Sequence, residues 1–94
     1  SYGTALASSG RHARAIPVLR EATAMATRHF ATDDVMTGVY LGTYGNALRE
    51  AREYAAAEPV LRDAEARLSR TGGARGFLAV RARVYLGDVL RARG

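Results

Sequence analysis

This chain of 94 residues contains no cysteine and no lysine, and each absence excludes particular bonds or binding sites. Without cysteine, neither a disulfide nor a thiolate metal site can stabilise the fold. Without lysine, there is no phosphate-binding loop of the Gly-x-x-x-x-Gly-Lys type. The apolar runs are much shorter than the roughly 20 residues that a helix needs to cross a bilayer. We therefore expect a protein that does not enter the membrane, and a cytoplasmic one, because cysteine-free chains suit a reducing compartment.

Proline and β-branched residues are also scarce, whereas helix-forming residues dominate. The chain has two prolines against nineteen alanines, and all fourteen of its basic residues are arginine. Alanine is the strongest helix former, and arginine ranks close behind it. A length of 94 residues allows one small domain with one core. The composition therefore predicts a single all-α segment over 1–94.

The net charge of +5 is concentrated near the end of the chain. Residues 1–69 hold eight arginines and eight acids, whereas residues 70–94 hold six arginines and the single acid Asp88. Arginine forks suit carboxylates and phosphates. The arginine-rich end therefore has two interpretations. It binds an acidic peptide or a phosphate backbone, or it pairs with acids on a helix that would follow it.

A repeat of forty-two residues runs through the chain. The stretch IPVLREA begins at Ile16 and the stretch EPVLRDA begins at Glu58, and the two agree at five of seven positions. A Gly-x-x-Leu pair recurs with the same period and starts at Gly3, Gly45 and Gly87. Because two independent landmarks share one period, the pattern predicts a repeat architecture.

Apolar residues at helical spacing predict about five helices, and short connections make neighbouring helices antiparallel. The expected ranges are 2–9, 12–29, 34–50, 54–69 and 76–92. Asp33 and Asp34 supply an N-cap and favourable charge for the third of these helices. The apolar stripe of the last helix is expected to run through Phe77, Val80, Val84, Leu86 and Leu90.

Pro17 and Pro59 conflict with the helix starts at 12 and 54, because each proline removes a helix N–H. A proline is tolerated in the first turn of a helix but not a full turn deeper. We therefore expect these two helices to begin nearer Arg14 and Ala56, or to open locally at the proline.

The repeat unit resembles the tetratricopeptide repeat, in which the second helix carries an Ala-x-x-x-Leu-x-x-Ala pattern. That pattern occurs here at residues 15–22 and again at residues 57–64. The period of forty-two, together with Ala57-Glu58-Pro59, is similar to the kinesin-light-chain type of this repeat. That type also occurs in bacterial multidomain signalling proteins. The resemblance implies a solenoid of antiparallel helix pairs that forms a right-handed superhelix with a concave and a convex face.

The resemblance also divides the chain and assigns its packing residues. Repeat 1 covers 1–33 with a truncated first helix, repeat 2 covers 34–75, and the first helix of repeat 3 covers 76–94. We therefore expect a fragment of a longer protein. The expected core residues are leucines that fill gaps beside small residues, namely Leu6, Leu19, Leu48, Leu61 and Leu90. Arg83 departs from the family pattern, which has a large apolar residue there. The apolar face of residues 77–93 is expected to be exposed, which allows self-association through the terminal helices.

No group of residues has the spacing of a catalytic or metal site. His12 and His29 lie seventeen residues apart, and no acid stands at a fixed offset from both. The glycine-rich stretch at 71–76 follows a helix rather than a strand, so it predicts a loop between helices instead of a phosphate site. We therefore expect no catalytic residue, no metal and no cofactor, and a protein that is not an enzyme.

In the family that the repeat resembles, the first helix of each pair lines a concave groove that binds an extended peptide or a partner helix. For this chain the resemblance implies a groove lined by Thr4, Ser8, Asn46, Arg49, Glu50, Arg81, Asp88 and Arg91. Asn46 can both donate to and accept from an extended backbone. The three arginines would favour an acidic peptide and steer its approach.

We therefore predict a non-catalytic scaffold for protein–protein interaction. One alternative is nucleic-acid or phosphate binding through the arginine-rich last helix. The tyrosines of the chain are not interleaved with these arginines as a stacking platform for bases requires, which disfavours nucleic-acid binding. Another alternative, compatible with the scaffold, is a regulatory segment of a larger signalling enzyme such as a kinase or an NTPase.

Overall fold

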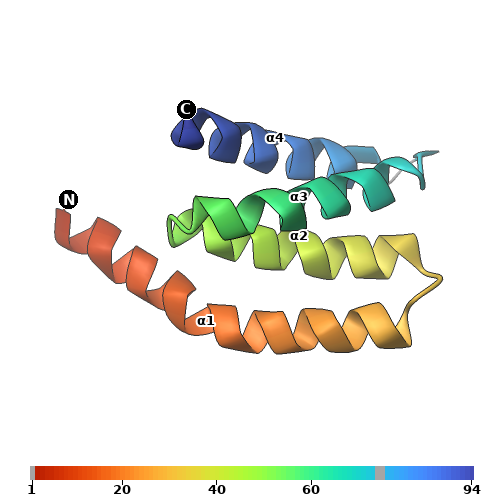
Figure 1. Ribbon diagram of the computed structural model, residues 1–94, viewed down its shortest axis with the longest axis horizontal. Coiled ribbons are helices and arrows are strands. Elements are labelled where there is room, and N and C mark those ends of the chain that lie inside the picture. Colours follow the sequence, from red (N-terminus) through yellow and green to blue (C-terminus); the bar gives the residue numbers. More distant parts are fainter. Residues whose placement is uncertain (1, 74–75) are drawn as a thin grey trace.

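The computed structural model describes the backbone of residues 2–73 and 76–94, and the side chains from residue 13 onward within those ranges. The described chain forms four helices and no strand, which confirms the all-α prediction. They are α1 (Tyr2–His29), α2 (Asp34–Glu50), α3 (Tyr54–Ser69) and α4 (Gly76–Arg93). Each helix packs against the next one along the chain, and α2 also contacts α4 (Figure 1). Among these helices, none is long and apolar enough to cross a membrane.

The prediction of about five helices is wrong, because α1 continues where a break was expected between residues 9 and 12. α1 is one helix of 28 residues and includes Gly10. A glycine inside a helix costs only about 1 kcal/mol. A separate helix over 2–9 would have to be nucleated anew, which is unfavourable for so short a segment. Continuing α1 therefore avoids a larger cost than the glycine imposes.

The predicted range 54–69 is confirmed by α3, whereas the later helix starts at Arg14 and Ala56, which were expected because of the prolines, are wrong. α3 begins at Tyr54 with Pro59 inside it, and α1 runs through Pro17. Each proline leaves one carbonyl, four residues earlier, without its helical hydrogen bond, and both helices accept this loss. Figure 1 shows α1 changing direction where its red part meets its orange part. A helix that contains proline is expected to bend in this way.

The ends of α2 follow from local side-chain and backbone hydrogen bonds. Asp33 is the N-cap, as predicted, and its carboxylate accepts from the Met36 N–H at 3.0 Å. At the other end Arg52 has a positive φ of 63°, although it is not glycine. The Arg52 N–H donates to the Arg49 carbonyl and the Glu53 N–H donates to the Leu48 carbonyl. These two bonds form a Schellman motif, which turns the chain from α2 into α3.

The interface between α2 and α3 depends on two glycines that face leucines. A Cβ built on Gly45 would lie 2.5 Å from Leu61 Cδ2, and one built on Gly38 would lie 2.7 Å from Leu68 Cγ. Leu61 is 0% exposed and Leu68 is 2% exposed. The two leucines therefore occupy the space that side chains at Gly38 and Gly45 would need. Close approach of α2 and α3 is the reason for both glycines.

At two positions the α3–α4 interface has acids in ion pairs where the α1–α2 interface has uncharged residues. Glu58 and Glu65 stand forty-two residues after Ile16 and Thr23, which are buried where α1 packs on α2. Glu65 Oε1 accepts from Arg83 Nη2 at 2.9 Å, and Glu58 Oε1 accepts from an Arg93 nitrogen, also at 2.9 Å. This exchange explains why position 83 carries arginine instead of the apolar residue that the repeat pattern leads one to expect.

The exposed face of α4 carries most of its predicted apolar stripe. Phe77, Val80, Val84 and Leu90 are 64%, 52%, 55% and 39% exposed, so the expectation that this face is uncovered is confirmed. Leu90 was expected in the core and this is wrong. The buried α4 residues are instead Ala79, Ala82 and Val89, and Leu78, Tyr85 and Leu86 pack partly buried beside them. α4 therefore has two apolar faces, of which only the one around Ala79, Ala82 and Val89 is covered.

Candidate binding surface between α2 and α4

Five of the eight predicted groove residues form one hydrogen-bonded network. Asn46, Arg49 and Glu50 come from the last turns of α2, and Asp88 and Arg91 come from the last turns of α4. These turns lie close because α2 and α4 both pack on α3 and also contact each other. A 3.5 Å pair between an Arg49 nitrogen and Asp88 Oδ2 joins the two helices. We call this network, with the hollow beside it, the α2/α4 surface.

Arg49 is the centre of this network. Its Nε and Nη2 donate to Asn46 Oδ1 at 3.1 and 2.8 Å, and Nη2 also donates to Glu50 Oε1 at 2.8 Å. Its guanidinium lies over the ring of Tyr85 from α4, at 4.8 Å from the ring centre. Such a cation–π contact is worth about 0.5–1 kcal/mol at a partly exposed site. Arg49 therefore holds Asn46 and Tyr85 in fixed positions and does not itself project as a free cation.

The orientation of the Asn46 amide follows from its contact with Arg49. A guanidinium has only donors, so the group that faces it must be the amide oxygen. Two bonds from Arg49 occupy that oxygen. The Asn46 NH2 group is then the part that remains to bind a ligand. Asn46 thus offers donors, and the expectation that it offers both a donor and an acceptor needs this refinement.

A small hollow of about 100 Å³ lies beside the network. Its lining residues come from both helices: Gly42, Thr43 and Asn46 from α2, and Arg81 and Tyr85 from α4. The Thr43 hydroxyl is engaged, since it donates to the Val39 carbonyl at 3.0 Å. The groups left to face a ligand are the Asn46 amide NH2, the Arg81 guanidinium and the Tyr85 hydroxyl. Most of these are donors, so the hollow suits an anion of the size of a carboxylate.

The predicted groove arginines differ in how they are engaged. Arg49 pairs with Glu50 and Asp88, and Arg91 pairs with Asp88. Arg81 is exposed and makes no ion pair with any described residue. Arg81 is therefore the cation of this surface that is best placed to attract an acidic ligand.

Some residues of this surface were not predicted from the sequence, and two of the predicted groove residues have side chains outside the described part of the chain. Thr4 and Ser8 were predicted groove residues, but their side chains lie outside the described residues. Tyr85 and Thr43 line the hollow without having been predicted. A signal for Tyr85 existed, because it lies one helical turn after Arg81 and so shares a face with it.

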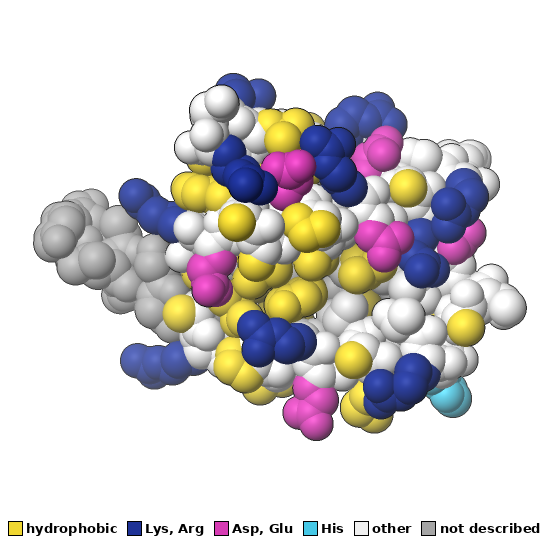
Figure 2. All heavy atoms as spheres, in the orientation of Figure 1, with side chains coloured by type: hydrophobic (Ala, Val, Ile, Leu, Met, Phe, Trp, Pro, Cys, Tyr) yellow, Lys and Arg dark blue, Asp and Glu magenta, His cyan; other side chains and the backbone are white. Residues whose placement is uncertain are grey.

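The arginines of the last quarter of the chain are largely paired within the chain. Arg70 pairs with Asp34 at 3.0 Å, Arg83 with Glu65, Arg93 with Glu58, and Arg91 with Asp88. Figure 2 shows basic and acidic side chains side by side over the part of the molecule where α3 and α4 lie in Figure 1. The neutralising acids come from α2, α3 and α4 themselves. An open phosphate-binding patch would need these arginines uncovered, and the pairing weighs against one.

Two of these pairs alter the pKa of their acids. The hydrogen bond from Arg70 lowers the pKa of Asp34. Hydrogen bonds from Arg83, and to a lesser degree from Ser69, lower the pKa of Glu65. Both carboxylates are therefore held in the charged form to lower pH than usual. Within the described part of the chain, no group of three or more His, Cys, Asp or Glu residues could hold a metal ion.

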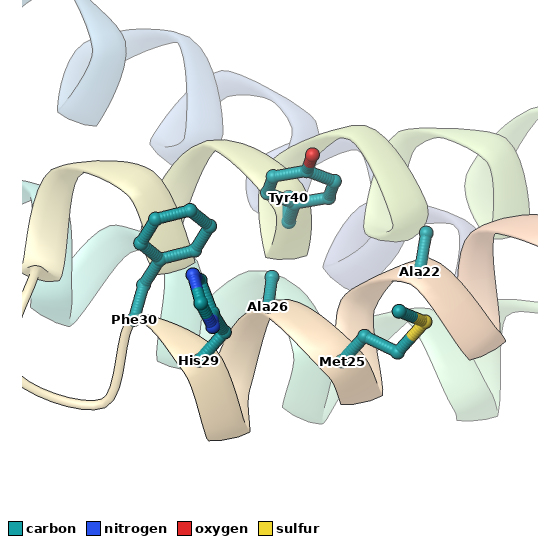
Figure 3. A pocket seen from close by; sticks show the side chains of 6 residues that line it. All are labelled: Ala22, Met25, Ala26, His29, Phe30 and Tyr40. Carbon is teal, nitrogen blue, oxygen red and sulfur yellow. The ribbon is translucent and has the colours of Figure 1, made fainter.

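A second hollow, of about 260 Å³, lies on the side of α1 (Figure 3). Its lining is Ala22, Met25, Ala26 and His29 of α1, with Phe30 and with Tyr40 of α2. This lining is mostly apolar and includes small alanines. The hollow suits an apolar side chain from another helix better than a charged ligand.

Comparison of the chain with models of protein families, with curated proteins and with solved structures finds no match.

Proposed function

We propose that this chain is a segment of a tetratricopeptide-type helical solenoid and that it serves as a non-catalytic scaffold that binds another protein. The repeat of forty-two residues supports this assignment, as does the packing of leucines against glycines between α2 and α3. In such solenoids each unit buries its apolar face against its neighbour. The proposal includes the cytoplasmic setting that a cysteine-free chain suits.

The ligand that we propose is an extended peptide with a carboxylate, bound at the α2/α4 surface. The observation that carries this proposal is the hollow that is lined by Asn46, Arg81 and Tyr85 and has no acid among its lining residues. A carboxylate there would accept from Arg81 and Asn46 together. A hydrogen bond to a charged group contributes about 1.5–3 kcal/mol, and exposure to water places this site at the lower end.

Arg49 and Asp88 have a positioning role in this proposal. Arg49 fixes the Asn46 amide and lies on Tyr85, and Asp88 holds Arg49 in place from α4. Replacing Arg49 with alanine would let Asn46 rotate, would leave Glu50 unpaired and would leave Asp88 with Arg91 as its one partner. The uncovered Glu50, and an Asp88 that is less fully neutralised, would repel a carboxylate. Arg49→Ala should therefore weaken an acidic peptide severalfold, although Arg49 does not touch it.

The test uses peptides selected from a random dodecapeptide library displayed on phage, then made as fluorescein-labelled synthetic peptides. Each peptide is measured by fluorescence polarisation in its acidic form and as the matched amide, with Asn for Asp, Gln for Glu and an amidated C-terminus. The acidic form should bind about tenfold more tightly, which corresponds to about 1.4 kcal/mol. Arg81→Gln should remove most of that difference.

The matched control is Arg62→Gln, which removes the same charge from an exposed residue of α3 that is not among the residues lining the hollow. It should change affinity by less than about twofold, because only long-range charge is lost. Equal binding of the acidic and amide peptides would overturn the proposed ligand class. Equal losses in Arg81→Gln and Arg62→Gln would overturn the proposed site.

A further inference from the structure

We propose that the chain associates with a second copy of itself head to tail, with α1 of one copy docked on the exposed face of α4 of the other. In this arrangement α1 of the second copy takes the place on α4 that α3 takes on α2. Both surfaces carry exposed large apolar side chains in the described structure. Phe77, Val80 and Val84 are 64%, 52% and 55% exposed on α4, and Val18 and Met25 are 68% and 57% exposed on α1.

The repeat places these two surfaces in the roles of α2 and α3. α4 follows α2 by forty-two residues, and the second half of α1 precedes α3 by forty-two residues. In the α2–α3 interface, Gly45 receives Leu61 and Val60. The corresponding residues in the proposed interface are Gly87 on α4, and Leu19 and Val18 on α1.

The proposed interface therefore keeps a glycine opposite a leucine at this position. A Cβ built on Gly87 would meet only the distal nitrogens of the flexible Arg91 side chain, the nearer at 3.4 Å. The surface at Gly87 is otherwise open for the leucine of another helix.

At a second pair of positions, the small and the large residue change helices between the α2–α3 interface and the proposed interface. Gly38 faces Leu68 in the α2–α3 interface, a small residue on α2 against a large one on α3. The corresponding residues are Val80 on α4 and Ala26 on α1, so the larger residue is now on the other helix. Exchanges that conserve volume across an interface preserve its packing. This compensation is specific to α4 against α1.

The same register brings α4 side chains to the hollow on α1. It places Phe77 opposite His29 and Val84 opposite Ala22. His29 and Ala22 line the hollow of about 260 Å³ shown in Figure 3, as does Met25. An exposed phenylalanine on one surface thus meets an apolar hollow on the other. Covering both would remove from water the most exposed apolar side chains of α4 and α1.

A two-fold pairing of α4 with α4 fits less well. It would place Val80, Val84 and Phe77 of one copy against the same large residues of the other. The small residues that would receive them, Ala22 and the 4% exposed Ala26, line the hollow on α1. The size complementarity therefore favours a contact between unlike surfaces. Such a heterologous contact leaves one free surface at each end, so copies add in an open series.

Sedimentation of the whole chain over a wide range of concentration tests this association. The mean mass should rise continuously with concentration and should not stop at a dimer. Val80→Glu blocks the α4 surface and Val18→Glu blocks the α1 surface, and both positions are exposed, so both variants should fold. Each variant alone should stay monomeric. An equimolar mixture should form a one-to-one dimer, because one intact α4 surface meets one intact α1 surface.

The control is Ala66→Glu, which makes the same change of charge at an exposed position on α3. This variant should still associate in an open series, as the wild-type chain does. A wild-type chain that stays monomeric at every concentration would overturn the proposal. So would a dimer that Val80→Glu abolishes and Val18→Glu leaves intact, because that result indicates α4–α4 pairing. A mixture of the two variants that stays monomeric would also contradict it.

The absence of cysteine permits a second, independent measurement. Val60 Cγ1 lies 3.3 Å from a Cβ built on Gly45, and the corresponding pair across the proposed interface is Gly87 and Val18. Copies that carry Gly87→Cys and copies that carry Val18→Cys should form a mixed disulfide under mild oxidation. Disulfides only between identical copies, or none at all, would contradict the assigned register.

Discussion

Replacing single glycines of α2 with alanine tests whether the α2–α3 contact depends on the absence of side chains. Alanine in place of glycine inside a helix should stabilise it by about 1 kcal/mol. At Gly45 the added methyl carbon would lie 2.5 and 2.7 Å from two carbons of Leu61. Leu61 is 0% exposed and cannot move into solvent. Overpacking of this kind costs about 1–3 kcal/mol, so Gly45→Ala should lower the free energy of unfolding by about 1–2 kcal/mol.

Gly42 provides the matched control on the same helix. A Cβ built on Gly42 has nothing within 4 Å, so Gly42→Ala should gain helix propensity without a clash. Its free energy of unfolding should rise by about 0.5–1 kcal/mol. Thermal unfolding followed by circular dichroism can resolve the difference, since 1 kcal/mol shifts the midpoint of a domain of this size by about 4–8 °C. If Gly45→Ala were as stable as Gly42→Ala, the close approach of α2 and α3 would be refuted.

Four further substitutions test the core, the end of α2 and the pairing of charges. Leu61→Ala should cost about 2–5 kcal/mol in urea unfolding, whereas Leu90→Ala, at a 39% exposed residue, should cost less than about 1 kcal/mol. Arg52→Gly should raise the free energy of unfolding by about 0.5–1 kcal/mol, because glycine adopts the φ of 63° without strain. The lowered pKa of Glu65 means that its pair with Arg83 stabilises the fold above the unfolded pKa of about 4.3 and is lost as pH falls through the lower folded value. The midpoint of unfolding should therefore fall less from about pH 5 to pH 3 in Glu65→Gln than in the wild-type chain. Equal pH dependence of the two proteins would contradict the role of this ion pair.

The parts of the fold that the sequence predicted well are those in which local signals and periodicity agree. The start of α2 was predicted because Asp33 is a strong N-cap, and its carboxylate does accept from Met36. The apolar spacing also predicted the range 54–69 of α3, whereas the later helix starts at Arg14 and Ala56, which were expected because of the prolines, are wrong. Pro17 and Pro59 each remove one hydrogen bond, and the packing of both helices compensates for that loss.

Predicting the face of α4 from periodicity alone fails for a physical reason. α4 carries apolar residues on two faces, and helical spacing does not show which of them meets α3. The face with Ala79, Ala82 and Val89 packs inward, with Leu78, Tyr85 and Leu86 partly buried beside it. Phe77, Val80 and Val84 remain outside.

The α2/α4 surface could be predicted as a location but not as chemistry. The repeat placed Asn46, Arg49 and Asp88 on the first helices of successive units, and the structure brings them together. Whether an arginine is free or paired depends on the positions of the acids around it. Spacing along one helix therefore did not show that Arg49 pairs with Asp88, thirty-nine residues away, as well as with Glu50 beside it, or that Arg81 makes no ion pair with a described residue.

The most direct test of the proposed function is a two-dimensional 15N–1H NMR titration with a selected acidic peptide. The side-chain NH2 resonances of Asn46 report on the donor that we assign to the ligand, and the Nε–H resonance of Arg81 reports on the cation. Both should shift strongly and in proportion to occupancy, together with backbone amides around Thr43 and Tyr85. Binding of the peptide with these signals unmoved, and with the shifts confined to the outer faces of α1 or α3, would contradict the assignment of the α2/α4 surface.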